Sequence, residues 1–270
     1  MISVARLYRF PVKSMLGEQV DTVEVTSDGL AGDRTFAVTD GTGRIGSVKH
    51  PRKWGPLLQC RARTSGPDTA AVTLPDGGSY DARDPDLVEQ LSKLLDRRVS
   101  VLDTPPDGLV LERAVPGVDG TVGGGPVTTD ETGTAFTTGR SNGFFDFATV
   151  HAVTTVSLAS LRRAYPGGDF DARRFRPNLV IDMPGNGFPE DDWAGRQIAV
   201  GGALLEGMIP TPRCVIPALA HDELPADSNI LRTVAREHRV AAAGRMACVG
   251  IYLKVVSPGQ VSLGDTVSLR

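Results

Sequence analysis

The chain has 270 residues, which is enough for one large domain or two of ordinary size. Its 29 basic and 32 acidic side chains give a formal net charge of −3, and this argues against a dedicated nucleic-acid-binding protein, because such proteins usually carry a basic excess. The sequence has no apolar run of about 18 residues and no signal peptide at its start. We therefore expect a cytoplasmic protein that does not bind a membrane.

Short apolar-rich runs between Gly/Pro turns predict strands in the first third of the chain. The runs cover residues 2–7, 20–25, 36–38, 57–62 and 71–74. Asp84 is a good helix N-cap, Pro85 suits the first helical position, and the leucines that follow form one apolar face, so a helix is expected from 85 to 95. A strand at 99–102 completes a region typical of a barrel or sandwich.

Residues 103–134 contain few large apolar side chains and many Gly, Pro, Asp and Thr residues. This composition predicts a domain of residues 1–105, a linker or long surface loop at 106–134, and a second domain at 135–270. In the second domain we expect two short helices, at 157–165 and 228–238, and strands at 150–155, 179–181, 198–200 and 203–209. Residues 249–256 and 261–269 are typical of a closing hairpin. The predicted fold class is α+β, mostly β.

The three cysteines are widely spaced, which argues against a disulfide framework or a structural metal centre. Cys60 and Cys248 lie in apolar runs that favour burial in the core. Cys214 follows Arg213, whose charge favours the thiolate, the form that acts as nucleophile or soft metal ligand. From the residues alone, a small buried side chain is an equally good interpretation of Cys214.

Several basic segments suit a small anion. Lys13-Ser14 follows a predicted strand and could hold a phosphate, although an exposed surface lysine is the more frequent outcome. Arg34 ends a Gly-rich turn, and its planar guanidinium suits phosphate, although a local Asp33–Arg34 pair is more frequent.

A run of three arginines, 173, 174 and 176, precedes a buried strand. Like charges this close together favour an anion site over a solvated basic edge. Arg176 precedes Pro177, which predicts an extended backbone at Arg176, and the amide of Asn178 offers both donor and acceptor. The four histidines show no metal-ligand spacing, and Asp191-Asp192 is interpreted as surface or capping groups.

Taken together, these segments resemble the MOSC family of molybdenum-cofactor-binding domains, preceded by the N-terminal β-barrel domain that accompanies it. The first half carries Phe10-Pro11-Val12-Lys13-Ser14 and Gly29-Leu30-Ala31-Gly32-Asp33-Arg34. The second half carries Val150 to Thr155, Arg174-Phe175-Arg176-Pro177-Asn178, Glu190-Asp191-Asp192-Trp193, Pro212-Arg213-Cys214, Cys248 to Tyr252 and Gly264-Asp265-Thr266-Val267. The resemblance implies an N-terminal β-barrel-like domain plus a MOSC β-barrel domain with a few short helices.

The resemblance also implies a site. Cys214 would be the ligand of the molybdenum in a molybdopterin-bound cofactor, and the cofactor's phosphate would be held by Lys13, Ser14 and Arg34. Arg176 and Asn178 would contact the pterin, and Thr154, Thr155 and Arg213 would line the same pocket. Thiolate for the metal and cations for the phosphate agree with the chemistry of these side chains.

Relatives with this two-domain layout reduce N-hydroxylated compounds, such as hydroxylaminopurines and amidoximes, to amines. The resemblance therefore implies a molybdenum-dependent reductase whose hard chemistry is supplied by the cofactor. The sequence has no cysteine set for an iron–sulfur domain, so a separate ferredoxin- or flavin-type protein would supply electrons. It has no aminotransferase-like domain with a pyridoxal lysine either, so sulfurase activity is not expected.

The sequence departs from its relatives after the cysteine. Ala218 and Ala220 stand where relatives often carry polar residues. This leaves a second hypothesis, a non-catalytic protein that stores or passes on the cofactor or sulfur.

Overall fold

The computed structural model describes residues 1–41, 44–66, 68–105, 110–115, 128–133 and 143–270. The chain forms two compact units, each discontinuous in sequence. Unit 1 comprises Met1–Tyr8, Gln19–Ala31 and Ala148–Arg270, and unit 2 comprises Arg9–Glu18 and Gly32–Phe147. The domain boundaries predicted from composition stay a prediction. The segment interpreted as a linker or loop contains two paired strands, and its residues 106–109, 116–127 and 134 lie outside the described residues.

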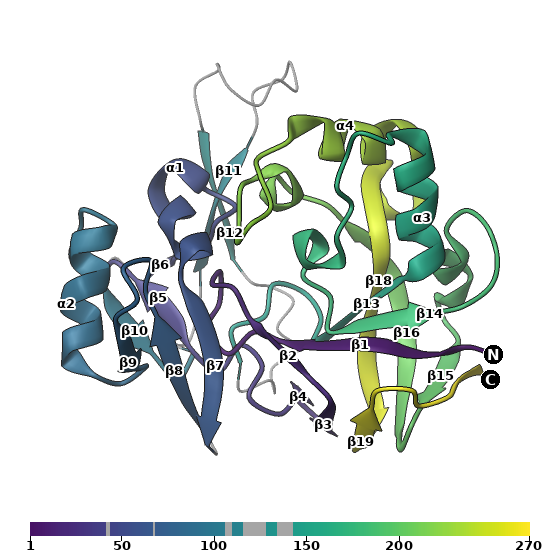
Figure 1. Ribbon diagram of the computed structural model, residues 1–270, viewed down its shortest axis with the longest axis horizontal. Coiled ribbons are helices and arrows are strands. Elements are labelled where there is room, and N and C mark those ends of the chain that lie inside the picture. Colours follow the sequence, from purple (N-terminus) through teal and green to yellow (C-terminus); the bar gives the residue numbers. More distant parts are fainter. Residues whose placement is uncertain (42–43, 67, 106–109, 116–127, 134–142) are drawn as a thin grey trace. The chain divides into compact units, whose positions relative to one another are not determined.

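Unit 1 is built on a large mixed sheet (Figure 1). Within the described residues the strand order is β2-β1-β14-β13-β18-β16-β15-β20, and β17 pairs with β18. The strands are β1 (Ser3–Arg9), β2 (Glu18–Val20), β13 (Val150–Thr154), β14 (Leu179–Asp182), β15 (Gln197–Val200), β16 (Ala203–Pro212), β17 (Arg239–Val240), β18 (Met246–Ser257) and β20 (Val267–Leu269). Arg9 and Glu18, at the ends of β1 and β2, belong to unit 2.

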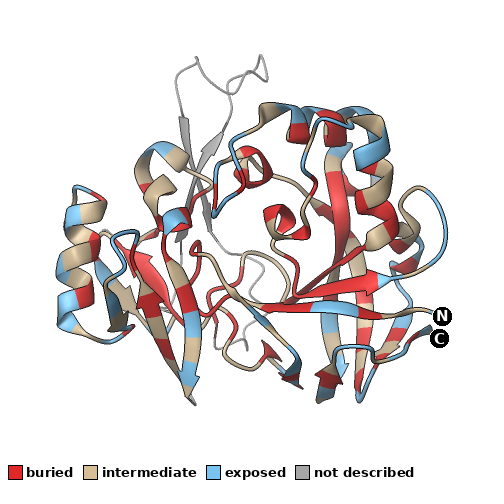
Figure 2. Ribbon diagram, viewed as in Figure 1, coloured by how far each residue is buried: buried red, intermediate tan, exposed pale blue. Residues whose placement is uncertain are grey.

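The helices of unit 1 pack on this sheet. Helix α3 (Thr155–Ala164) contacts β13 and β14, and α4 (Ser228–Glu237) contacts β18 and α3. Short 3-10 turns are η2 (Ala172–Phe175), η3 (Pro189–Trp193), η4 (Ile216–Ala218) and η5 (Ala241–Ala243). Strand β13 is buried at all five positions, including the polar His151 and Thr154, as in a strand that is covered on both faces (Figure 2).

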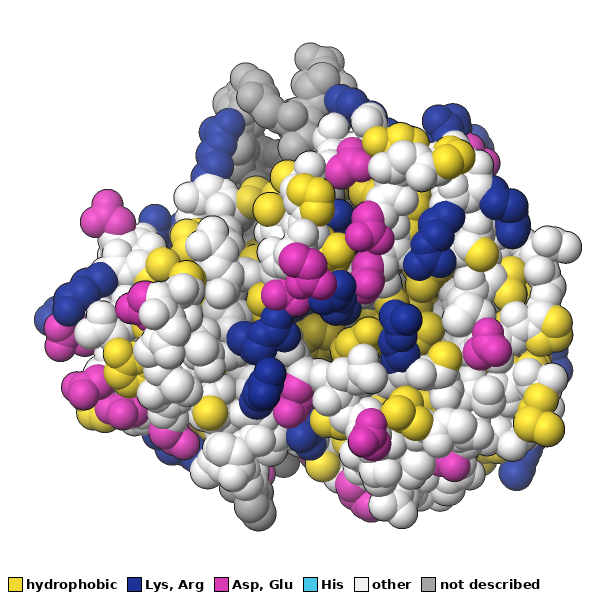
Figure 3. All heavy atoms as spheres, viewed as in Figure 1, with side chains coloured by type: hydrophobic (Ala, Val, Ile, Leu, Met, Phe, Trp, Pro, Cys, Tyr) yellow, Lys and Arg dark blue, Asp and Glu magenta, His cyan; other side chains and the backbone are white. Residues whose placement is uncertain are grey.

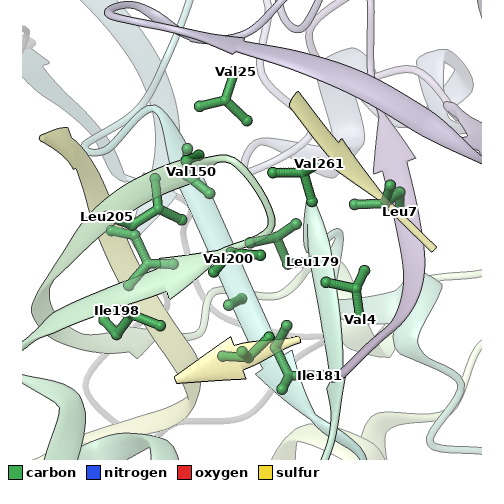
Figure 4. Packing of buried hydrophobic residues seen from close by; sticks show 14 of the residues in the cluster. Val4, Leu7, Val25, Val150, Leu179, Ile181, Ile198, Val200, Leu205 and Val261 are labelled. Carbon is green, nitrogen blue, oxygen red and sulfur yellow. The ribbon is translucent and has the colours of Figure 1, made fainter. Parts of the chain in front are cut away.

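A smaller sheet of unit 1 has the order β19-β3-β4, from Gly259–Ser262, Thr22–Thr26 and Gly29–Leu30. Side chains from both sheets form one aliphatic core (Figure 4). The hairpin expected between 249–256 and 261–269 is wrong, because β19 pairs with β3 and β20 with β15. A Cβ at Gly259 would lie 2.2 Å from the Gly202 carbonyl oxygen, so the chain leaving β18 packs closely against the turn before β16.

The described residues of unit 2 form two sheets. One has the order β10-β5-β6-β11-β12 and the other β7-β8-β9. The strands are β5 (Ala37–Thr39), β6 (Arg44–Ile45), β7 (Arg61–Gly66), β8 (Thr69–Thr73), β9 (Ser79–Asp81), β10 (Ser100–Leu102), β11 (Val110–Val115) and β12 (Thr128–Gly133). The helical segments are α1 (Pro51–Trp54), η1 (Gly55–Gln59) and α2 (Pro85–Leu94).

Local sequence explains two of these elements. The Asp84 side chain caps α2 by accepting from the Asp86 amide, which confirms the predicted N-cap. The strand predicted at 57–62 is wrong in its first half. Pro56 suits the start of a helical turn, and the Cys60 amide closes that turn on the Leu57 carbonyl at 3.2 Å, so the strand begins only at Arg61.

The structure confirms the predicted fold class, α+β and mostly β with a few short helices. Among the described residues, no helix combines the length and the apolar character needed to cross a membrane.

Candidate functional site

Two segments of unit 2 that are far apart in sequence bring Lys13 and Arg34 together. The Lys13 amide donates to the Phe36 carbonyl at 2.8 Å, and the Arg34 amide donates to the Phe10 carbonyl at 2.8 Å. Val12 and Phe36 form a parallel bridge between the same segments. The two cations predicted to bind phosphate therefore lie on adjacent stretches of backbone.

Lys13 is buried, with 5% of its surface exposed, so the more frequent outcome, an exposed lysine, does not apply. Its Nζ donates to the Phe144 carbonyl at 2.9 Å and pairs with one carboxylate oxygen of Asp146. The other Asp146 oxygen pairs with Lys49 at 2.8 Å. Burial lowers the pKa of Lys13 to about 8; Asp146 acts against this shift, whereas Lys49 and Arg34 add to it.

Arg34 pairs with the buried Asp33, so the local Asp–Arg pair is present. The second Asp33 oxygen accepts from the Phe10 amide at 2.7 Å. The guanidinium carbon of Arg34 also lies 5.3 Å from the centre of the Phe10 ring and 5.7 Å from that of Phe145. Arg34 is thus held in place by a carboxylate and two rings.

We define Lys13, Arg34 and Lys49 as the basic cluster. Its carboxylate partners are Asp33 and Asp146, so these five residues together carry one excess positive charge. The face of the molecule in Figure 3 mixes Lys and Arg with Asp and Glu side chains, and the whole chain has a formal net charge of −3. The cluster is therefore a local concentration of positive charge in a slightly acidic chain.

Ser14 occupies a left-handed backbone position, with φ 72°, next to Lys13. Its hydroxyl accepts from the Val48 amide at 3.2 Å and lies 3.4 Å from the Gly46 carbonyl, to which it donates. Ser14 is 6% exposed. In this structure its hydroxyl therefore fixes the loop that leads to Lys49.

In unit 1, Cys214 lies in the irregular segment between β16 and η4. It is half-buried, whereas Cys60 and Cys248 are fully buried, as expected from their apolar surroundings. Burial raises the pKa of the Cys60 thiol to about 12 and that of Cys248 to about 11. Cys214 therefore differs from Cys60 and Cys248 in being partly exposed.

Arg213, the neighbour of Cys214, is held from several sides. Its amide donates to the Ala247 carbonyl at 2.8 Å, and its Nη2 donates to the Phe175 carbonyl at 2.9 Å. Its Nη1 lies 3.3 Å from Nε2 of His151, which accepts because a guanidinium only donates. Nε of Arg213 is buried and has no hydrogen-bond partner within the described residues. Arg213 therefore keeps one buried donor unused.

His151, which the spacing of the histidines gave no reason to select, connects several of the predicted residues. Its amide donates to Oδ1 of Asn178 at 3.1 Å, and its carbonyl accepts from the Asn178 amide at 2.7 Å. Its Nδ1 lies 3.4 Å from the Arg176 carbonyl. Nδ2 of Asn178 donates to the Tyr8 carbonyl at 3.3 Å, and Asn178 is 1% exposed. The side-chain amide of Asn178, the residue before β14, thus links β1 and β13.

The expectation of an extended backbone at Arg176 is wrong. Arg176 ends η2 in the left-handed region, with φ 52° and ψ 47°, and its amide donates to the Arg173 carbonyl at 3.1 Å. This hydrogen bond closes the turn and outweighs the preference that Pro177 imposes on its neighbour.

The structure accounts for the other two arginines of this run without an anion. The guanidinium of Arg174, a residue that is 1% exposed, donates to the carbonyls of Asp169, Pro217, Leu219 and Pro225. Arg173 pairs with the carboxylates of Asp171, Asp222 and Glu223. Arg173 and Arg174 therefore have structural partners, and neither needs an anion to offset its charge.

The two threonines predicted to line the pocket contact acids. Thr154 caps α3, and its hydroxyl donates to Oε2 of the buried Glu190 at 2.8 Å. The hydroxyl of Ser157 donates to the same oxygen at 2.6 Å, while Oε1 of Glu190 is buried without a partner among the described residues. Thr155 donates to Asp182 at 2.8 Å. Glu190 is a second residue whose environment the sequence did not indicate.

Apart from Thr154 and Thr155, which contact acids, the predicted residues form two groups. Lys13, Ser14 and Arg34 gather in unit 2, and Arg176, Asn178 and Arg213 gather around His151 in unit 1, with Cys214 next in sequence to Arg213. Within the described residues no three His, Cys, Asp or Glu side chains are close enough to hold a metal ion together.

Comparison with protein families identifies both parts of the chain. The MOSC domain matches residues 139–268, and the MOSC N-terminal beta barrel domain matches residues 1–90. The chain therefore belongs to the MOSC domain-containing proteins that carry this N-terminal barrel domain, which confirms the resemblance. No curated protein matches its sequence significantly.

Solved structures with some similarity include the YUAD protein from Bacillus subtilis, which is 12% identical with a TM-score of 0.43, over 100% of this chain and 96% of that one. YiiM from Geobacillus stearothermophilus is 19% identical with a TM-score of 0.32, and YiiM from Escherichia coli is 20% identical with a TM-score of 0.33. Each YiiM match covers 46% of this chain and 54% of the YiiM chain.

Proposed function

We propose that this protein binds a molybdenum cofactor and reduces N-hydroxylated compounds, such as hydroxylaminopurines and amidoximes, with electrons from a separate redox protein. The observation that carries the proposal is the half-buried thiol of Cys214, which follows Arg213 in the MOSC domain, whereas Cys248 of the same domain and Cys60 of the N-terminal domain are fully buried. A soft, partly accessible cysteine sulfur is a suitable protein ligand for molybdenum.

The side chains present fit such a cofactor chemically. The excess positive charge of the basic cluster suits a terminal phosphate, for which Lys13, Ser14 and Arg34 are the proposed ligands. The unused Nε–H of Arg213 is a buried donor that a polar cofactor group could satisfy. Arg176 and Asn178 are the proposed pterin-side residues. The amide of Asn178 is buried, so Asn178 would act by fixing the backbone of His151 and Tyr8.

In this proposal the residues of the chain bind and orient the cofactor. The bound cofactor would supply a two-electron redox couple for reductive cleavage of the N–O bond. Arg213 donates to the Phe175 carbonyl of η2 and to the Ala247 carbonyl of β18. The backbone that carries Cys214 is therefore tied to both elements. Arg174 holds the stretch after the cysteine through the Pro217 and Leu219 carbonyls. The proposed metal ligand is therefore placed by arginines that do not themselves react.

A carrier that stores or transfers the cofactor is the second candidate function. Ala218 is buried and Ala220 is exposed. Because both have only a methyl side chain, neither supplies a polar group to the stretch after Cys214. A protein with the cofactor-binding residues but without such groups would bind the cofactor and leave substrates unchanged.

The test begins with protein made in a host that synthesises the cofactor. Molybdenum content is measured for the wild type, for Cys214→Ala, and for Cys60→Ala, which removes a fully buried thiol as the control. We expect the metal in the wild type and in Cys60→Ala and its loss in Cys214→Ala. Unchanged molybdenum in Cys214→Ala removes the central claim.

The loaded wild type is then supplied with a reduced dye and a hydroxylamine or amidoxime. Formation of the amine supports the reductase. Molybdenum bound without amine formation leaves the carrier as the function.

A further inference from the structure

The carboxylate of Asp146 lies between the two lysines of the basic cluster. One oxygen pairs with Lys13 Nζ, and the other lies 2.8 Å from Lys49 Nζ. Lys13 and Lys49 hold the pKa of Asp146 well below its usual range, although burial acts in the opposite direction. Asp146 is therefore an ionised carboxylate with one lysine on each oxygen, the arrangement in which two lysines would hold a phosphate.

Backbone hydrogen bonds fix the chain two residues before this carboxylate. The Phe144 amide donates to the Arg34 carbonyl at 2.8 Å, and the Phe144 carbonyl accepts from Lys13 Nζ at 2.9 Å. Asp146 follows two residues later, in a stretch without regular secondary structure, and 31% of its side chain is exposed. The anchor lies at Phe144, so rotation of the partly exposed Asp146 side chain leaves the backbone contacts intact.

Lys49 is brought to the cluster by Ser14. The Ser14 hydroxyl binds the Val48 amide and the Gly46 carbonyl, and the Lys49 amide donates to the hydroxyl of the buried Ser47 at 3.3 Å. The loop that carries Lys49 is thus tied to the residue that follows Lys13. Lys49, which no motif of the sequence indicated, has a fixed backbone beside the two expected cations.

We propose that Asp146 is an internal counter-anion that occupies the phosphate position of the basic cluster until a phosphate group displaces it, and that Lys49 is a further ligand of that phosphate. The two lysines and Arg34 carry three positive charges, which Asp33 and Asp146 reduce to one. A phosphate dianion entering beside Asp146 meets a like charge, whereas one that replaces Asp146 meets two lysines. The proposal rests on the proposed function only for the identity of the molecule that carries the phosphate.

Inorganic phosphate is the probe, titrated calorimetrically into the full chain purified without cofactor. We expect Asp146→Asn to bind phosphate at least about tenfold more tightly than the wild type, since one close ion pair less competes with the ligand. Asp40→Asn is the matched control: Asp40 pairs with Lys53 at 2.7 Å in the same unit and outside the cluster, and its substitution changes the net charge equally. Equal or weaker phosphate binding by Asp146→Asn overturns the competing role.

Lys49→Gln provides a second test that keeps Asp146 and the buried Lys13 pair, in case Asp146→Asn does not fold. We expect it to weaken phosphate binding at least about fivefold, and the control Lys53→Gln to leave it unchanged. Unchanged affinity in Lys49→Gln refutes its role as a ligand.

The metal measurement separates this inference from the proposed function. Tighter phosphate binding by Asp146→Asn in a chain that never acquires molybdenum supports the counter-anion and rejects the cofactor. Molybdenum in the wild type, with no gain of phosphate affinity in Asp146→Asn, supports the cofactor and rejects the counter-anion.

Discussion

The basic cluster of unit 2 and the Arg173–Arg174 pair of unit 1 both concentrate positive charge, but they neutralise it differently. In the cluster, three cations share two carboxylates, one of them partly exposed. In the pair, four carbonyls surround Arg174 and three carboxylates surround Arg173. A group of cations is therefore a better candidate anion site where an exchangeable carboxylate neutralises it than where fixed carbonyls and carboxylates surround it.

The largest effect is expected at Arg174. Replacing it with Met leaves buried carbonyl acceptors without their donor, at ~1–3 kcal/mol for each group left unpaired, so we expect a loss of several kcal/mol in the free energy of unfolding. Urea unfolding measures the loss. Arg162→Met is the control, because the exposed Arg162 donates to a single carbonyl, that of Phe170. Equal losses in the two variants would show that Arg174 is not the structural group inferred here.

The difference between the two regions shows what the sequence could predict. Helix α2, strand β13 and the apolar surroundings of Cys60 and Cys248 follow from local patterns of capping and burial. The partners of Lys13 do not, because Phe144 and Asp146 are 131 and 133 residues away. Local charge patterns indicate which residues are cationic, and the fold decides which acids and carbonyls meet them.

His151 and Glu190 were missed for the same reason. Their partners come from other elements and follow no periodic spacing. His151 contacts Asn178 and Arg213, and Glu190 contacts Thr154 and Ser157. The family motifs placed both residues in conspicuous segments, but a motif does not show which atom each side chain contacts.

Glu190 keeps one buried carboxylate oxygen, Oε1, without a hydrogen-bond partner among the described residues, and its replacement comes next in expected effect. Burial raises its pKa above the ordinary value of 4.5, although Ser157 and Thr154 act in the opposite direction. The folded state therefore holds the proton more tightly than the unfolded chain. The associated stability is present below pH 4.5 and is lost as pH rises through the raised folded pKa.

We therefore expect Glu190→Gln to become more stable relative to the wild type as pH rises from below the ordinary pKa of Glu to neutrality. The expected gain is about 1 kcal/mol or more, which is the cost of one unpaired buried polar atom. Unfolding in urea at several pH values measures this. The exposed Asp192→Asn is the control for loss of an acid. A difference between Glu190→Gln and the wild type that does not change with pH contradicts the expectation.

A third prediction concerns the basic cluster. Since burial lowers the Lys13 pKa to about 8, its positive charge is present at pH 7 and mostly absent at pH 9. Sulfate is the suitable probe because its own charge stays constant over this range. We expect its affinity to fall up to about tenfold between these pH values, and to fall less in Lys13→Arg, whose guanidinium stays protonated. The same decline in both proteins would show that Lys13 does not hold the anion.

The smallest effect is expected at Arg173. Its three ion pairs are partly exposed, with 32% of its side chain accessible, so Arg173→Gln should cost about 1 kcal/mol or less. That cost should shrink further when salt is raised, because exposed pairs are screened. Thermal unfolding at low and high salt measures it, with Lys93→Gln, which removes the exposed pair with Glu89, as the control. A large, salt-independent loss would place Arg173 with Arg174 as a buried structural cation, and the sequence run Arg173-Arg174 would then act as one unit rather than as an outer and an inner residue.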